Sequence, residues 1–181
     1  LSLHDALPIF ASEVCGRYGM PLTIRQHSLQ KFPFPIEGKF DLITVGYCLE
    51  ELFPETGKGW QQAQRQWIHS LLPYLSPQGM LLFVESSLLH SNHRLLALRD
   101  QLIKEGFAVQ APCVWKGDCP ALKTKNPCYA QRDFEKPTLI KEIQRAAQIN
   151  LSSLKMSYLL MRHPEAGWPL LSEHPLYRVI S

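Results

Sequence analysis

The chain has 181 residues and a formal net charge of +3, with 45% hydrophobic and 19% charged residues. This composition excludes a disordered polyelectrolyte, and no apolar run approaches the roughly 18 residues of a membrane span, so no membrane partner is expected. The length favours one domain with one sizeable core, and the mild basic excess permits a nucleic-acid partner without requiring one.

Five cysteines are present, an odd number without the density of a small disulfide-rich domain. The sequence shows no signal-peptide pattern, and we therefore expect reduced thiols in a cytosol-like compartment.

Both ends of the sequence indicate a fragment. Residues 1–9, LSLHDALPI, look like one reading frame of a common sequencing adapter, and we exclude them from the fold prediction; the alternative is a genuine N-terminal helix. The last residues, LYRVIS, stop as an apolar segment begins. We therefore expect residues 10–181 to be the C-terminal part of a single domain.

The first elements are predicted from local patterns. Residues 10–18 favour a short helix that ends at Gly19. Residues 22–28 alternate apolar and polar side chains and predict a short strand. Residues 39–46 (KFDLITVG) predict a strand buried on both faces, as in a parallel sheet.

The middle of the chain alternates helices with strands. Apolar residues at helical spacing predict a helix over residues 60–72 that ends at Pro73. Residues 76–79 predict a turn, and residues 80–84 a fully apolar strand that ends at Glu85. Asn92 is expected to cap a helix that runs to about Glu105 and is closed by Gly106. The core stripe expected on this helix consists of Leu95, Leu98, Leu102 and Ile103.

The last elements are a strand over residues 107–111, a helix after Pro137 and a strand over residues 156–161. Strands that alternate with helices predict a doubly wound α/β sheet, in which ligands bind at the carboxyl ends of the strands. The residues expected at those ends, and so at a ligand site, are His27, Ser28, Gly46, Tyr47 and Cys48. Tyr47 either stacks on a ligand or packs, and Cys48 is more simply a small buried residue than a nucleophile.

The segment Ala111–Arg132, here called the cysteine segment, carries three cysteines beside prolines: Cys113, Cys119 and Cys128. Thiolates on proline-stiffened loops suit a soft metal or an iron–sulfur cluster, although the spacing is not that of a zinc ribbon, and loop cysteines without a joint role are the alternative. The same segment carries four cations that suit rRNA phosphates or a plain solvated loop: Lys116, Lys123, Lys125 and Arg132.

The strand FDLI, the sequence LEEL and the stretch LSPQGMLLFVE resemble the later strands of class I S-adenosylmethionine-dependent methyltransferases. The resemblance implies a partial Rossmann-like sheet whose N-terminal strands are missing, with a Cys-rich insertion at about residues 112–136 before the last strand. It also implies that S-adenosylmethionine binds at the strand ends named above. The glycine-rich turn and the acidic ribose ligand of that fold have no counterpart here, and the catalytic residues are unknown.

The three cysteines with their prolines and the sequence KMSYL (155–159) resemble the Rsm-type small-ribosomal-subunit methyltransferase-like family of bacteria and mitochondria. The resemblance covers about residues 39–161. It implies a methyltransferase-like protein that acts on or binds rRNA of the small subunit, or a non-catalytic assembly factor, in a bacterial cytoplasm or a mitochondrial matrix. No DNA partner is expected.

The resemblance also implies that Cys113, Cys119 and Cys128 are ligands of a four-iron, four-sulfur cluster, with the fourth cysteine beyond Ser181; zinc is the alternative. Two departures from the family pattern concern the surroundings of these thiols. Trp115 stands where the family often has histidine, and Pro127-Cys128-Tyr129-Ala130 stands where it often has Trp-Cys-His-Phe.

Overall fold

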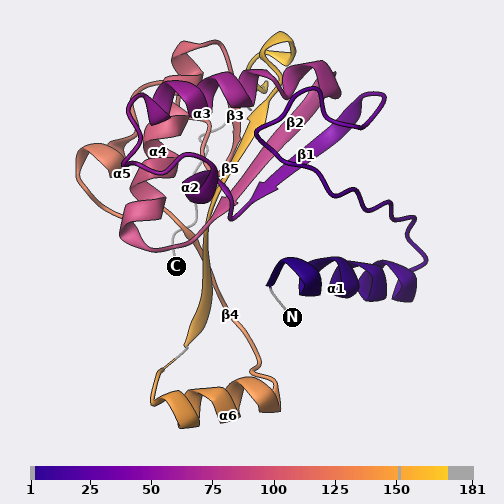
Figure 1. Ribbon diagram of the computed structural model, residues 1–181. Coiled ribbons are helices and arrows are strands. Elements are labelled where there is room, and N and C mark those ends of the chain that lie inside the picture. Colours follow the sequence, from indigo (N-terminus) through magenta and orange to yellow (C-terminus); the bar gives the residue numbers. More distant parts are fainter. Residues whose placement is uncertain (1–2, 151, 171–181) are drawn as a thin grey trace. The chain divides into compact units, whose positions relative to one another are not determined.

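The computed structural model of the chain describes residues 3–150 and 152–170 (Figure 1). The chain divides into two compact units, one up to Glu37 and one from Gly38 onward. In the first unit, helix α1 spans Leu3–Arg17, so the predicted helix over residues 10–18 is confirmed. The chain turns at Gly19, which has a φ of 62°. Helix α1 also includes residues 3–9. A helix does not show where a sequence comes from, so the adapter origin of residues 1–9 stays a prediction.

The predicted strand over residues 22–28 is wrong. The structure assigns these residues no regular secondary structure, and the side chains of Leu22 and Ile24 are exposed. A strand needs the backbone hydrogen bonds of a neighbour, and alternation of side chains does not supply one.

The second unit contains a mixed, open sheet of five strands with the order β1-β2-β5-β3, while β4 pairs with β5 outside this path. Strand β1 (Phe40–Gly46) is parallel to β2 (Leu75–Glu85), and β5 (Ser153–Arg162) runs antiparallel to both β2 and β3 (Ala108–Ala111). The predicted α/β class is thus confirmed, but the sheet is not purely parallel, because the last strand enters between β2 and β3.

One face of this sheet forms the core of the unit. Leu81 and Phe83 of β2 and Leu159 of β5 are buried, whereas their neighbours along each strand are half-buried. Helix α4 (Leu89–Lys104) contacts β2, β3 and β5, and α3 (Trp60–His69) packs on α4 (Figure 1). The stripe predicted for α4, in which Leu98 and Leu102 are buried, therefore faces the sheet.

Strand β1 lies at an edge of the described sheet, and the prediction that it is buried on both faces is wrong. Val45 is buried, but Leu42 is 53% exposed. A strand becomes buried on both faces when it has helices above and below and strands on both sides. Among the described residues β1 has a strand partner in β2 alone.

The turn predicted at residues 76–79 is instead a bulge inside β2. Phe40 pairs with Leu75 and Leu42 with Met80, so residues 76–79 lie opposite Asp41 and pairing resumes after them. A Cβ atom on Gly79 would lie 2.9 Å from the carbonyl oxygen of Phe40, so the close approach of β1 requires glycine here. Turn-type residues thus interrupt the ladder without ending the strand.

The helix predicted from Asn92 begins earlier, at Leu89, and the prediction that Asn92 caps it is wrong. Asn92 lies inside α4 and is fully buried. The predicted close at Gly106, with a φ of 96°, is confirmed. The helix predicted over residues 60–72 ends at His69, and a 3-10 turn over Leu72–Tyr74 contains Pro73.

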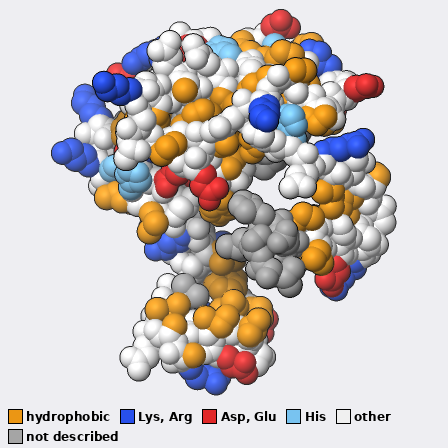
Figure 2. Space-filling model, viewed as in Figure 1, with side chains coloured by type: hydrophobic (Ala, Val, Ile, Leu, Met, Phe, Trp, Pro, Cys, Tyr) orange, Lys and Arg blue, Asp and Glu red, His pale blue; other side chains and the backbone are white. Residues whose placement is uncertain are grey.

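Between β3 and β5 lie the cysteine segment and a projecting helix. Short α5 (Pro120–Lys123) and β4 (Ala130–Asp133) were not predicted, whereas α6 (Thr138–Ala147) confirms the helix expected after Pro137. β4 pairs with residues 153–156 of β5, so β5 is shared between this ribbon and the main sheet. No side chain of α6 is buried, and apolar side chains, among them the exposed Leu139 and Ile143, gather on its surface (Figure 2).

Two short elements complete the description: helix α2 (Leu49–Leu52) and a 3-10 turn over Pro164–Ala166. Within the described residues, no helix has the length and apolar character that crossing a membrane requires.

Candidate functional site

The carboxyl ends of β1 and β2 lie at the same edge of the sheet because the two strands are parallel. Gly46 pairs with Val84, and the backbone N–H of Tyr47 donates to the carbonyl oxygen of Val84 at 2.9 Å. Tyr47 has a φ of 51° and is 61% exposed, so it points a large aromatic ring toward solvent at the expected ligand edge. The structure thus brings Gly46, Tyr47 and Cys48 together beside Glu85.

His27 and Ser28, the other two residues predicted for this edge, belong to the first unit. There the imidazole Nε2 of His27 lies 2.9 Å from the carbonyl oxygen of Lys31, and its ring meets the edge of Phe34. Ser28 is exposed, and its carbonyl oxygen accepts a hydrogen bond from the Lys31 N–H. These contacts form a local turn within that unit.

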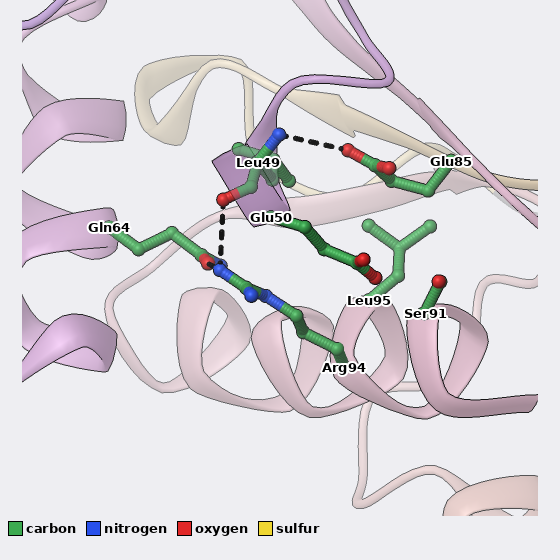
Figure 3. A pocket seen from close by; sticks show the side chains of 7 residues that line it. All are labelled: Leu49, Glu50, Gln64, Glu85, Ser91, Arg94 and Leu95. Atoms are coloured by element: carbon green, nitrogen blue, oxygen red, sulfur yellow. Dashed lines mark hydrogen bonds between the residues drawn. The ribbon is translucent and has the colours of Figure 1, made fainter. Parts of the chain in front are cut away.

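Glu85, at the end of β2, holds the start of α2. Its Oε1 accepts a hydrogen bond from the backbone N–H of Leu49 at 3.2 Å (Figure 3), which satisfies one of the unpaired amides that begin a helix. Burial raises the pKa of Glu85 above its usual value. Burial, reinforced by the charges of Glu85 and Glu51, also raises the pKa of the Cys48 thiol to about 11. Cys48 is therefore a protonated thiol near neutral pH and not a nucleophile.

Arg94 of α4 binds the same short helix from the other side. Its Nη2 donates to the carbonyl oxygen of Leu49 at 3.0 Å and to Oε1 of Gln64 at 2.7 Å (Figure 3). It also donates to the carbonyl oxygen of Phe53 at 2.6 Å. The guanidinium also lies 4.3 Å from the ring centroid of Trp60. One buried cation thus ties α2, α3 and α4 together.

A narrow space, too small to hold a water molecule, lies between these polar groups. It is lined by Leu49, Glu50, Gln64, Glu85, Ser91, Arg94 and Leu95 (Figure 3). Sites for small-molecule ligands usually measure roughly 300–1,000 Å³. Within the described residues this space is smaller than that range, and Gln64, Glu85 and Arg94 are bonded to Leu49 or to each other. We interpret it as the support of the Gly46–Cys48 turn.

The cysteine segment is attached to α4 by three polar side chains, here called the α4 clamp: Asn92, Arg99 and Asp100. Asn92 bonds both backbone groups of Cys128, donating to its carbonyl oxygen at 2.8 Å and accepting from its N–H at 2.9 Å. The same amide donates to Oγ of the buried Ser157 in β5 at 2.8 Å. One fully buried side chain therefore joins the helix, the sheet and the loop.

The other two members of the α4 clamp bind the first half of the segment. The Asp100 carboxylate accepts from the backbone N–H of Cys119 at 3.0 and 3.1 Å. Arg99 is 1% exposed, donates to the carbonyl oxygens of Trp115 and Gly117, and pairs with Asp100. Hydrogen bonds to charged groups stabilise by about 1.5–3 kcal/mol each, so these contacts hold the first half of the segment on α4.

The thiols themselves are distributed along this attached loop. Cys119 is buried, while Cys113 and Cys128 are half-buried. In the part of the chain that the structure describes, no group of three or more His, Cys, Asp or Glu side chains could hold a metal ion. The four predicted RNA-binding cations, in contrast, are all exposed: Lys116, Lys123, Lys125 and Arg132.

Sequence reasoning did not find the α4 clamp or the pair Glu85 and Arg94. A signal was present: Arg99 and Asp100 follow Asn92 by seven and eight positions, a spacing that places all three on one side of a helix. The leucines of the core stripe lie among them. Polar residues on a buried helical face need internal partners. Their partners are backbone atoms, however, and these cannot be read from a sequence.

Comparison with known proteins decides the family. The model of the family described as "Mitochondrial small ribosomal subunit Rsm22" matches residues 17–177. The chain belongs to the Rsm22 family. The matched range includes both the Gly46–Cys48 turn and the whole cysteine segment. No curated protein matches the chain in sequence.

Proposed function

We propose that this Rsm22-family chain associates with the small ribosomal subunit and contacts its rRNA through the cysteine segment. The observation that carries the proposal is the α4 clamp: it fixes the backbone of a loop that presents exposed cations, among them Lys123 and Lys125. A loop whose backbone is already fixed loses less conformational entropy when its cations meet phosphate than a flexible loop does. The family description supports the ribosomal partner and favours a mitochondrial matrix location over a bacterial cytoplasm.

The experiment is co-sedimentation of the chain with purified small subunits across a salt series. We expect binding to weaken with salt, since each phosphate contact contributes roughly 0.7–0.9 to the logarithmic slope. The double variant Lys123→Ala/Lys125→Ala should reduce that slope by roughly 1.5, whereas Lys58→Ala/Lys141→Ala, which removes two exposed cations elsewhere, should leave it unchanged. Absence of co-sedimentation at every salt concentration would overturn the proposal.

For the sheet we propose a methyltransferase-like role, in which S-adenosylmethionine binds at Gly46, Tyr47 and Cys48. The shared edge of two parallel strand ends supports this site. Methyl transfer depends mainly on positioning the donor in line with the acceptor. The site therefore needs residues that hold the donor at the sheet edge, and it does not need a general base.

A second candidate is a non-catalytic assembly factor, favoured by the bonded network behind the same edge. Glu85 and Arg94 are bonded to the protein, and the space between them is too small to hold a water molecule. Equilibrium dialysis of the chain with S-adenosylmethionine separates the two roles. Saturable binding that Gly46→Val weakens supports the methyltransferase-like role, whereas absence of binding supports the assembly role.

We also propose that the three thiols of the cysteine segment bind an iron–sulfur cluster, with zinc as the alternative. Thiolates are the ligands that both groups use, and the prolines beside these cysteines stiffen the loop that presents them.

A bound cluster would cross-link the loop through Cys113, Cys119 and Cys128, while the α4 clamp positions the backbone that presents two of them. Metal analysis and visible absorbance of the purified chain test this assignment. Iron and sulfide with charge-transfer absorbance that Cys119→Ser abolishes would support it; a colourless chain that contains zinc would contradict it.

A further inference from the structure

Trp115 is a large aromatic side chain that the fold leaves at the surface, with 59% of it exposed. It lies in the cysteine segment, two residues after Cys113. Trp67 of α3, in comparison, is buried in the core. A single exposed aromatic residue is common on protein surfaces and needs no explanation by itself. What distinguishes Trp115 is that its backbone and its ring are both fixed.

Three contacts fix it. The carbonyl oxygen of Trp115 accepts a hydrogen bond from the buried Arg99, a member of the α4 clamp. The indole Nε1 donates to the carbonyl oxygen of Asp118 at 3.1 Å. Gly117 lies against the ring, where an added Cβ would be 3.0 Å from Nε1. Because the one polar atom of the indole is used within the loop, the part left to a partner is its apolar π surface.

An exposed cation, Lys116, follows Trp115 in the sequence. Its Nζ lies 5.3 Å from the ring centroid of a different tryptophan, Trp168. Asp118, the nearest acidic residue in the sequence, lies 3.6 Å from Nζ of Lys104, so its charge is partly neutralised. A fixed aromatic face beside a cation is the combination that binds single-stranded nucleic acid, in which the base stacks and the phosphate meets the cation.

We propose that Trp115 is a stacking platform for an unpaired rRNA base and that Lys116 contacts the adjacent phosphate. This inference rests on the proposed rRNA contact and names the kind of RNA that it needs: a single-stranded loop, bulge or end. A duplex keeps its bases stacked on each other and offers no free face. The type of side chain determines how strongly a base stacks on it, since a base stacks on an indole more extensively than on a smaller ring.

The test uses the whole chain and a labelled 12-nucleotide oligouridylate, alone and paired with its complement, with binding followed by fluorescence anisotropy. We expect Trp115→Ala to weaken single-strand binding roughly 5- to 150-fold, the loss of one stacked base. Trp115→Phe should retain most of the affinity, and Trp115→Leu, which keeps apolar bulk without a π face, should behave like Trp115→Ala. Duplex binding and the salt slope should stay unchanged.

The matched control is Tyr18→Ala, which removes another exposed aromatic ring and should have no effect. If the unmodified chain binds RNA in a salt-dependent way and Trp115→Ala and Trp115→Leu bind the single strand equally well, the stacking inference is overturned and the rRNA proposal stands. If the unmodified chain binds neither RNA, both fail. If Trp115→Ala weakens binding to small subunits but not to the oligonucleotide, the residue contacts protein, and the inference is again wrong.

Discussion

Replacing Asn92 by alanine should release the cysteine segment from the core. Asn92 is fully buried and makes three hydrogen bonds, two to the backbone of Cys128 and one to Ser157. A typical internal hydrogen bond contributes about 1 kcal/mol net, so Asn92→Ala should lower the free energy of unfolding by about 3 kcal/mol. The matched control, Asn126→Ala, removes an exposed amide from the same segment and should change stability by less than about 0.5 kcal/mol.

Urea denaturation measures the loss in free energy of unfolding, and amide hydrogen exchange shows which residues lose protection. We expect exchange in residues 119–132 to accelerate in Asn92→Ala more than exchange at Phe83 in the core of the sheet. A double-mutant cycle with Ser157→Ala should give a coupling of about 0.5–1.5 kcal/mol, because the two side chains share a bond. Unchanged stability together with unchanged exchange in the segment would refute the claim that α4 holds this loop.

Three other changes test the support of the candidate site. Gly79→Ala should cost about 1–3 kcal/mol in urea denaturation, since its Cβ would lie 2.8 Å from the Leu75 side chain. Arg94→Ala should cost about 3 kcal/mol, because it removes three hydrogen bonds from Nη2, to two carbonyl oxygens and the Gln64 amide, each contributing about 1 kcal/mol. The Cys48 thiol, with a pKa of about 11 against 9.0 normally, should resist alkylation at pH 8, and Glu85→Gln should lower that pKa by removing a nearby negative charge.

The Cys48 shift also fixes a direction for stability against pH. The folded state keeps the thiol protonated above pH 9.0, where the unfolded chain begins to lose the proton. The contribution of Cys48 is therefore complete below pH 9 and is lost as pH rises toward about 11. If the urea midpoint falls equally between pH 9 and pH 11 in the unmodified chain and in Cys48→Ala, the assignment is contradicted.

The control for Gly79→Ala is Gly57→Ala, because the nearest atom to a Cβ added at Gly57 lies at an ordinary contact distance of 3.4 Å.

Elements with a strong repeat could be predicted from the sequence. The helical spacing of apolar residues in α3 and α4 and the apolar run before Glu85 identified those elements. Strand β4 (AQRD) was missed because it has no apolar pattern, and its strand character comes from pairing with β5. The wrong burial of β1 has a related cause: burial depends on neighbours, and a strand's own residues do not say whether it is at an edge.

The candidate site, too, could be predicted from the sequence only in part. The cysteines, the basic residues and the turn after β1 were visible because their residue types and positions indicate chemistry. The role of Asn92 was misread because asparagine at a helix start usually caps, whereas here the helix begins three residues earlier and the amide turns inward. The functions of Arg99 and Asp100 depend on backbone atoms of a loop some sixteen to nineteen positions away, which folding alone brings together.

The central claim is that α4 holds the cysteine segment so that its cations meet small-subunit rRNA. Site-specific cross-linking tests it most directly, with a photoreactive p-benzoylphenylalanine placed at position 123 in one variant and at position 58 in another, both replacing exposed lysines. After irradiation with purified small subunits, we predict an adduct to small-subunit rRNA from position 123 and none from position 58. Equal adducts from both positions, or adducts from position 123 to protein alone, would contradict the account.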